Sequence, residues 1–206
     1  FTDVSKLKGA TIGIPNLHAS ATMFFSMDLL DAGINPLPEA KEVNWKVMEP
    51  SVLADALKRG EVDAIVTWEP FESIPVVEGY GYFAEGLEYS QSEAVGAELG
   101  MLVATRSALE EKRDAVERFV WAYLDQQEKL SADTEAFTAA YSQLTGLEPA
   151  IAAEASKPIT LGSVLTTEQL ERQAKAFAEL GVIQRDVSGE IAQSWDASLV
   201  DEAQGQ

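Results

Sequence analysis

The chain has 206 residues, and 15 basic residues against 34 acidic ones give it a formal net charge of −19. A chain this acidic repels nucleic acid and anionic lipid surfaces, so neither is expected as a partner. It contains no cysteine, which excludes disulfides, thiol catalysis and cysteine metal sites. No apolar run approaches the roughly 20 residues that a membrane-spanning helix needs.

The first part of the chain alternates between strand and helix patterns. Short β-branched or alternating runs predict strands at Thr11–Pro15, Val43–Met48 and Asp63–Trp68. Apolar residues at helical spacing predict helices at Ser20–Ala32 and from Pro50 to Gly60. This alternation with short connections predicts an α/β fold with a parallel sheet.

The second part of the chain is mainly helical. After one further predicted strand at Glu98–Thr105, amphipathic patterns predict helices at Asp114–Leu130, Glu135–Leu144 and Thr166–Leu180, and a short helix that includes Trp195 and Leu199. These helices have no sheet of their own to cover. We therefore expect them to bury their apolar faces against each other or against something absent from this chain, which would leave apolar surface uncovered.

The first candidate site is the loop between the first predicted strand and helix. Its candidate ligand-binding residues are Asn16, His18, Ser20, Ala21 and Thr22. Amide groups at a helix N-terminus favour an anion, and ligands of open α/β sheets lie beyond the carboxyl ends of the strands. The alternative is that Ser20 only caps the helix. The loop lacks the glycines and lysine of a phosphate-binding loop.

The second candidate site is Trp68-Glu69, at the end of the third predicted strand. Trp68 offers a flat apolar wall with one N–H group, or it belongs to the core. Glu69 can hydrogen-bond a ligand or interact with a helix dipole. His18 is the only histidine, so a multi-histidine metal site is excluded, and no catalytic motif accompanies it. We expect no catalytic residue, no metal and no cofactor.

Two stretches carry a family resemblance. Leu7–Pro15 reads LKGATIGIP and Leu57–Pro70 reads LKRGEVDAIVTWEP. Both resemble recurring sequence motifs of the solute-binding proteins of nitrate, sulfonate and taurine ABC importers. The fold group of these proteins also includes thiamine-pyrimidine synthases. Ala150-Ile151 and Leu180–Ile183 are similar to the tail of the same family. The first loop departs from the family's Gly-Ser or Ser-Ser pattern, which puts simple sulfonate or taurine specificity in doubt.

The resemblance implies a type II periplasmic-binding-protein-like fold, a two-lobed clamp with the ligand between the lobes. Residues 1–106 would form a second-lobe-like α/β ligand-binding domain. Residues 107–206 would form a helical segment that returns to a first lobe, most of which is absent from this sequence. The ligand-binding positions carried over from the family are those in the two loops described above.

The resemblance also implies a function. The protein would be no enzyme but an extracytoplasmic solute-binding protein, made with a signal peptide and located in the periplasm or on the extracellular face of the membrane. It would capture a small anionic or aromatic molecule, such as a sulfonate, nitrate or an aromatic acid. Its partner would be an ABC transporter permease, and it would contact the membrane only through the transporter or a lipid anchor.

Two other classes of protein stay open. The first is a thiamine-pyrimidine synthase-like enzyme, which would need further histidine or cysteine residues than this chain has. The second is a ligand-sensing domain of a regulator, which would be joined to another domain. A signal peptide or a DNA-binding segment in the intact protein would separate these alternatives from an importer's binding protein.

Overall fold

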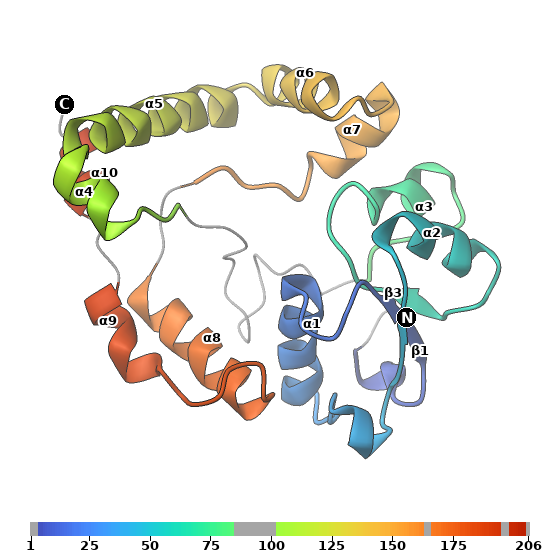
Figure 1. The fold of residues 1–206 in the computed structure, drawn as a ribbon. Helices are drawn as coiled ribbons and strands as arrows, with labels where there is room; N and C mark the ends of the chain where they lie inside the picture. Colours follow the sequence, from blue (N-terminus) through green and yellow to red (C-terminus); the bar gives the residue numbers. More distant parts are fainter. Residues whose placement is uncertain (1–3, 85–101, 163–165, 195–197, 205–206) are drawn as a thin grey trace.

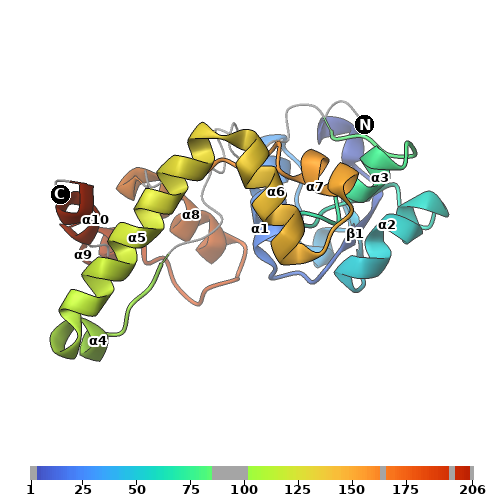
Figure 2. The same ribbon diagram turned by 90° about the horizontal axis from the view of Figure 1, so that it is seen from above.

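The computed structural model describes residues 4–84, 102–162, 166–194 and 198–204. The described elements are arranged in a ring (Figure 1). An α/β part (residues 4–84) at one side is followed by a helical arm (residues 102–145), and the chain then returns to the α/β part. Seen from above, the sheet lies at one end of the molecule and the arm extends away from it (Figure 2).

A small parallel sheet forms the centre of the α/β part. Its strands are β1 (Thr11–Ile14), β2 (Asn44–Val47) and β3 (Ala64–Ile65), in the order β2-β1-β3. Thr11 pairs with Asn44, and Ile12 pairs with Ala64. The predicted parallel sheet is therefore confirmed, with strands shorter than their sequence patterns.

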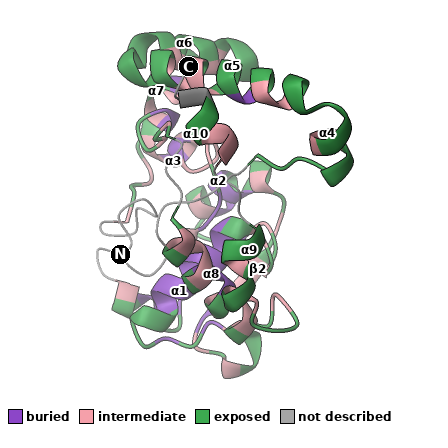
Figure 3. Ribbon diagram, turned by 90° about the vertical axis from the view of Figure 1, so that its left-hand side faces the viewer, coloured by how far each residue is buried: buried purple, intermediate pink, exposed green. Residues whose placement is uncertain are grey.

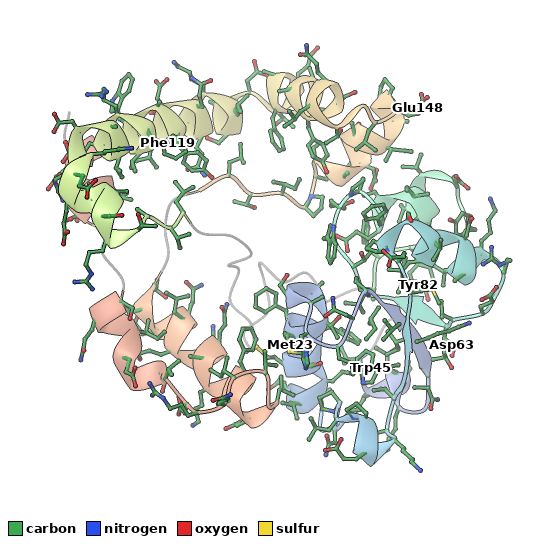
Figure 4. All side chains as sticks on the ribbon, viewed as in Figure 1. Met23, Trp45, Asp63, Tyr82, Phe119 and Glu148 are labelled. Atoms are coloured by element: carbon green, nitrogen blue, oxygen red, sulfur yellow. The ribbon has the colours of Figure 1, made fainter. Side chains whose placement is uncertain are left out.

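Helix α1 (Ser20–Asp31) covers the sheet and supplies much of the core. Ile12, Ile14 and Leu29 are completely buried, which stabilises the packing of α1 on β1. Figure 4 shows Trp45 on the side of α1 that faces the sheet. Its ring meets Phe25 edge-on at 6.3 Å between centroids, and its indole N–H donates to a backbone carbonyl.

The remaining elements of the α/β part are short. Helix α2 (Pro50–Lys58) begins with Pro50 at its first turn, as predicted, and α3 (Ser73–Val77) follows β3. Gly33 and Gly60 adopt left-handed conformations just after α1 and α2, where a side chain would be strained. Two 3-10 turns, η1 (Val4–Leu7) and η2 (Pro38–Ala40), complete this part of the fold.

The strand predicted at Glu98–Thr105 is not confirmed. Residues 98–101 lie outside the described part of the chain, and residues 102–105 form no strand. Leu102 and Val103 are 50% and 86% exposed. A strand needs a neighbour for its backbone hydrogen bonds, and within the described ranges the sheet ends at β2 and β3. The alternating pattern was therefore insufficient to place a strand here.

Helices dominate the described chain after residue 105, as predicted. The capping box of Thr166 and Gln169 opens α8, and Gly146 closes α6 in a left-handed conformation. Trp195 lies outside the described residues, so its place in the final helix is not tested. The elements are α4 (Arg106–Glu111), α5 (Arg113–Ala132), α6 (Thr134–Thr145), α7 (Pro149–Ala155), α8 (Thr167–Glu179), η4 (Ser188–Glu190), α9 (Ile191–Ser194) and α10 (Ser198–Gln204).

Burial differs sharply between the two parts of the molecule. Figure 3 shows buried residues concentrated in the α/β part and mostly exposed ones along α4, α5 and α6. On α5 only Val120 is buried, whereas Phe119 and Tyr123 are 57% and 41% exposed. The apolar face predicted for this helix is thus present and largely uncovered in this chain.

The chain closes the ring where α8 packs on α1. Phe24 and Met27 of α1 form a small cluster with Phe177 and Leu180, and the rings of Phe24 and Phe177 are 6.0 Å apart. Met23, on the side of α1 that faces α8, is buried as well (Figure 4). Within the described ranges, no helix has the length and apolar character required to cross a membrane.

Candidate functional site

The two candidate loops leave the sheet side by side. The loop after β1 and the loop after β3 both start at the carboxyl ends of neighbouring parallel strands. The backbone N–H of Val66 donates to the carbonyl of Gly13 at 2.9 Å, so the pairing continues beyond β3 itself. This edge of the sheet is where open α/β folds bind their ligands.

Hydrogen bonds within the first loop fix its shape. The side-chain oxygen of Asn16 accepts from the backbone N–H of His18 at 2.8 Å, which makes an Asx turn. The carbonyl of Asn16 accepts from the Thr22 hydroxyl at 2.8 Å. These bonds tie the start of the loop to the first turns of α1, so the loop is organised before a ligand arrives.

The five candidate residues of this loop divide into two groups. Asn16, His18 and Ser20 are exposed, so their side chains can meet a ligand. Ala21 and Thr22 are 3% and 0% exposed, respectively, so only their backbone could contribute to a site.

The capping role considered for Ser20 is wrong. The N-cap of α1 is Ala19, which makes no side-chain capping bond, and Ser20 is the first helical residue. The bonds of Asn16 to His18 and Thr22 hold the chain so that its extended conformation ends at Ala19. The Ser20 hydroxyl is therefore not required for the helix end.

Trp68 is 41% exposed at the end of the third strand pattern, so it does not belong to the core. Its indole can present a flat apolar face to a ligand. The residue before it was missed by sequence reasoning. Thr67 is 1% exposed, and its hydroxyl oxygen has no hydrogen-bond partner within the described part of the chain. Only its position at a strand end, next to Trp68, could have singled it out.

Glu69 has a different environment from Trp68. Its Oε1 accepts from the hydroxyl of Ser73 at 2.8 Å, and its Oε2 is buried. Burial raises the pKa of Glu69 to about 7, and the negative charge of Glu154 on α7 adds to the increase. Burial also raises the pKa of Glu72 to about 8, together with the charge of Glu69. Glu69 thus faces α7 as part of an acidic pair.

A hollow between α6 and α7 has no residue of either loop in its lining. Its lining includes Thr138, Ser142 and Ser156. The described residues contain no cluster of histidine, aspartate or glutamate suited to a metal ion. The edge formed by the first loop, Thr67 and Trp68 can offer hydrogen-bond donors and an aromatic wall to a ligand.

Comparisons with known proteins identify the family and the fold. A family model described as the NMT1-like family matches residues 2–155, well over half of the chain. No curated protein matches the sequence significantly. Among solved structures, the periplasmic aliphatic sulphonate binding protein SsuA from Escherichia coli is similar, with a TM-score of 0.73 and 17% identity over 93% of this chain and 60% of that one.

A second solved structure has the same fold. The alkanesulfonate-binding protein SsuA from Xanthomonas axonopodis pv. citri, bound to MOPS, matches with a TM-score of 0.68 and 19% identity over 91% of this chain and 63% of that one. This chain thus spans less than two thirds of either solved chain. The chain belongs to the NMT1-like family and has the fold of a periplasmic binding protein.

Proposed function

We propose that this chain is the ligand-binding α/β lobe and helical return of an extracytoplasmic solute-binding protein. The protein captures a small anionic or aromatic molecule in the periplasm, or at the extracellular face of the membrane, and delivers it to an ABC transporter permease. The observation that carries this proposal is that the first loop and Trp68 follow the carboxyl ends of neighbouring parallel strands, in a chain with this fold.

The exposed side chains suggest distinct roles. His18 adds a directional hydrogen-bond donor, Ser20 a hydroxyl, and Trp68 a wall for the apolar part of the ligand. The N-terminus of α1 favours the negative end of the ligand through its dipole. The sulfonate ligands of the two similar proteins have this combination of anionic group and apolar tail, which supports the same ligand class here.

We further propose that residues 107–206 return to the first lobe, most of which is not part of this sequence. The exposed Phe119 and Tyr123 rings stack on each other, with 6.3 Å between their centroids, and provide an apolar face for that lobe. The chain's coverage of 60% and 63% of the similar structures supports this arrangement. The ligand would then bind between the two lobes.

The test is a thermal-shift screen of the intact protein against alkanesulfonates, nitrate, aromatic acids and pyrimidines, followed by calorimetry on each hit. A ligand at a hundredfold over its Kd should stabilise the protein by about 2.7 kcal/mol. His18→Ala and Ser20→Ala should each weaken binding by about 0.5–1.5 kcal/mol, the loss of one hydrogen bond.

Val52→Ala is the matched control, because Val52 is 43% exposed on α2 and lies outside both loops. It should bind the ligand as tightly as the parent. If no compound of the four classes stabilises the intact protein, the proposed function is wrong. If His18→Ala and Ser20→Ala bind as tightly as Val52→Ala, the function stands but the site lies elsewhere.

A further inference from the structure

The acidic pair next to the candidate site lies where the two parts of the molecule meet. Glu69 precedes α3 and Glu72 is the N-cap of that helix, and α3 packs against α7. The charge of Glu154 on α7 raises the pKa of Glu69, after burial, and the charges of both glutamates raise the pKa of Tyr141 on α6, again after burial. The pair therefore lies at the start of α3, the helix on which α7 packs, and the α6–α7 corner joins the helical arm to the α/β part (Figure 1).

The hydrogen bonding of the pair requires a proton. Glu69 Oε2 is buried and accepts from no amide, hydroxyl or amine donor in the described part of the chain. The carboxyl groups of Glu69 and Glu72 also act on each other, and a hydrogen bond between them contributes to the pKa of both groups. Two ionised carboxylates have only acceptors, so one of the pair must carry a proton for this bond to form. A proton on Glu69 Oε2 would also satisfy this buried oxygen.

Few positive charges are available to replace this proton. Lys157, one turn after Glu154 on α7, pairs with Glu154 itself. On α2, which also packs on α3, Lys58 pairs with Glu78 beyond the other end of α3. Tyr141 offers a hydroxyl. Burial raises the pKa of this hydroxyl, and the charges of the acidic pair raise it further.

We propose that Glu69 and Glu72 form a proton-dependent latch between α3 and the α6–α7 corner. With one proton shared, the pair is hydrogen-bonded and the corner is docked on α3. When both carboxyls ionise, their mutual repulsion and the charge of Glu154 loosen α7. The latch would couple the position of the helical arm to the pH outside the cell membrane, where a binding protein works.

The direction of the pH effect follows from the pKa values. Burial raises the pKa of Glu69 to about 7 and that of Glu72 to about 8, from an ordinary value of 4.5 in the unfolded chain. The folded state therefore binds more protons than the unfolded state between these values. Stability is greatest below about pH 4.5 as far as this pair is concerned, and it falls as the pH rises toward about 8.

The test uses Glu72→Gln, whose amide donates a hydrogen bond to Glu69 at every pH. Near pH 5.5 the variant and the parent should have similar melting temperatures. Near pH 8.5 the variant should melt higher by about 2–4 °C, equivalent to one pKa unit of relieved repulsion. Glu110→Gln, on the exposed surface of α4, is the control and should follow the parent at both values.

Hydrogen exchange provides a second readout that a purely global stability change would not give. In the parent, raising the pH should lower the protection of the α7 amides more than that of the α8 amides, after correction for the intrinsic exchange rate. Glu72→Gln should abolish this difference. If Glu72→Gln does not fold, Glu69→Gln replaces it, because its amide oxygen can still accept from Ser73 and its N–H group can donate to Glu72. The latch would be contradicted by equal changes of protection in α7 and α8. It would also be contradicted if the melting temperature of the variant changed with pH as that of the parent does.

Discussion

At the residue scale, the shape of the first loop depends on one buried hydroxyl. Thr22 is fully buried, and its Oγ1 donates to the carbonyl of Asn16 across the start of α1. The carbonyl of Thr22 in turn accepts from the Ser26 hydroxyl at 2.8 Å. Thr22 therefore supports the loop from within the core and needs no contact with the ligand to do so.

Replacing this hydroxyl should destabilise the protein while leaving the volume of the core unchanged. Thr22→Val keeps the shape of the side chain but leaves the Asn16 carbonyl with only the long bond from the Ala19 N–H at 3.4 Å, so we expect a loss of about 1 kcal/mol in the free energy of unfolding. Chemical denaturation measures this loss. Ser20→Ala is the control, because Ser20 is exposed and caps nothing, and its effect should stay within about 0.5 kcal/mol.

The exposure of single residues and their contacts with distant parts of the chain could be predicted from the sequence only in part. Asn16, His18 and Trp68 were predicted from strand ends, and the structure leaves all three exposed at one edge. The environment of Glu69 could not be predicted, because it depends on Glu154, 85 positions away in the chain. Thr67 was missed for a similar reason: a threonine at a strand end reads as an ordinary strand residue until its burial is known.

At the scale of elements, β1 has no space for a side chain at its centre. A Cβ on Gly13 would lie 2.9 Å from Leu53 Cδ2 and 3.4 Å from Ile65 and Val62 side-chain atoms. Gly13 thus allows α2 and β3 to approach β1 closely. The absence of a side chain here determines how tightly α2 packs beside the candidate site.

Gly13→Ala should therefore overpack the sheet. We expect it to cost about 1–3 kcal/mol of stability, because Leu53 is completely buried and cannot move freely. Thermal denaturation measures the effect. Gly162→Ala is the matched control, since a Cβ there would meet nothing within 4 Å. An unchanged melting temperature for Gly13→Ala would show that α2 can shift without cost, contrary to this packing.

Most elements could be predicted because their signals are local. Pro50 at the start of α2, the capping box at Thr166 and the glycine after α6 mark helix ends through bonds within one turn. The strand predicted at Glu98–Thr105 failed within its described part, because a strand also depends on a neighbour. Sheet membership is a property of two segments, and one segment's pattern cannot establish it.

At the scale of the whole molecule, the two parts of the chain differ in how completely they bury their apolar residues. The α/β part has a closed core around β1 and α1. The arm instead exposes Val103, Phe119 and Leu144, and α5 contacts its helical neighbours rather than the sheet. This difference is the basis for proposing that the first lobe covers α5.

Phe119→Ala tests whether such a lobe covers the apolar face of α5. In the intact protein the substitution should cost about 3 kcal/mol, because a covered phenylalanine is lost. In the 206-residue chain alone it should cost little, because Phe119 is 57% exposed there. Denaturation of both forms measures the two values. A small effect in both would show that nothing covers this face of α5.

The proposed ligand site lies at the carboxyl ends of β1 and β3. The most direct measurement is a crystal structure of the intact protein with a ligand identified by the thermal-shift screen. The ligand should lie within hydrogen-bonding distance of the loop from Asn16 to Thr22 and pack against the indole of Trp68. A ligand bound in the hollow between α6 and α7, without contact to either loop, would contradict the proposed site.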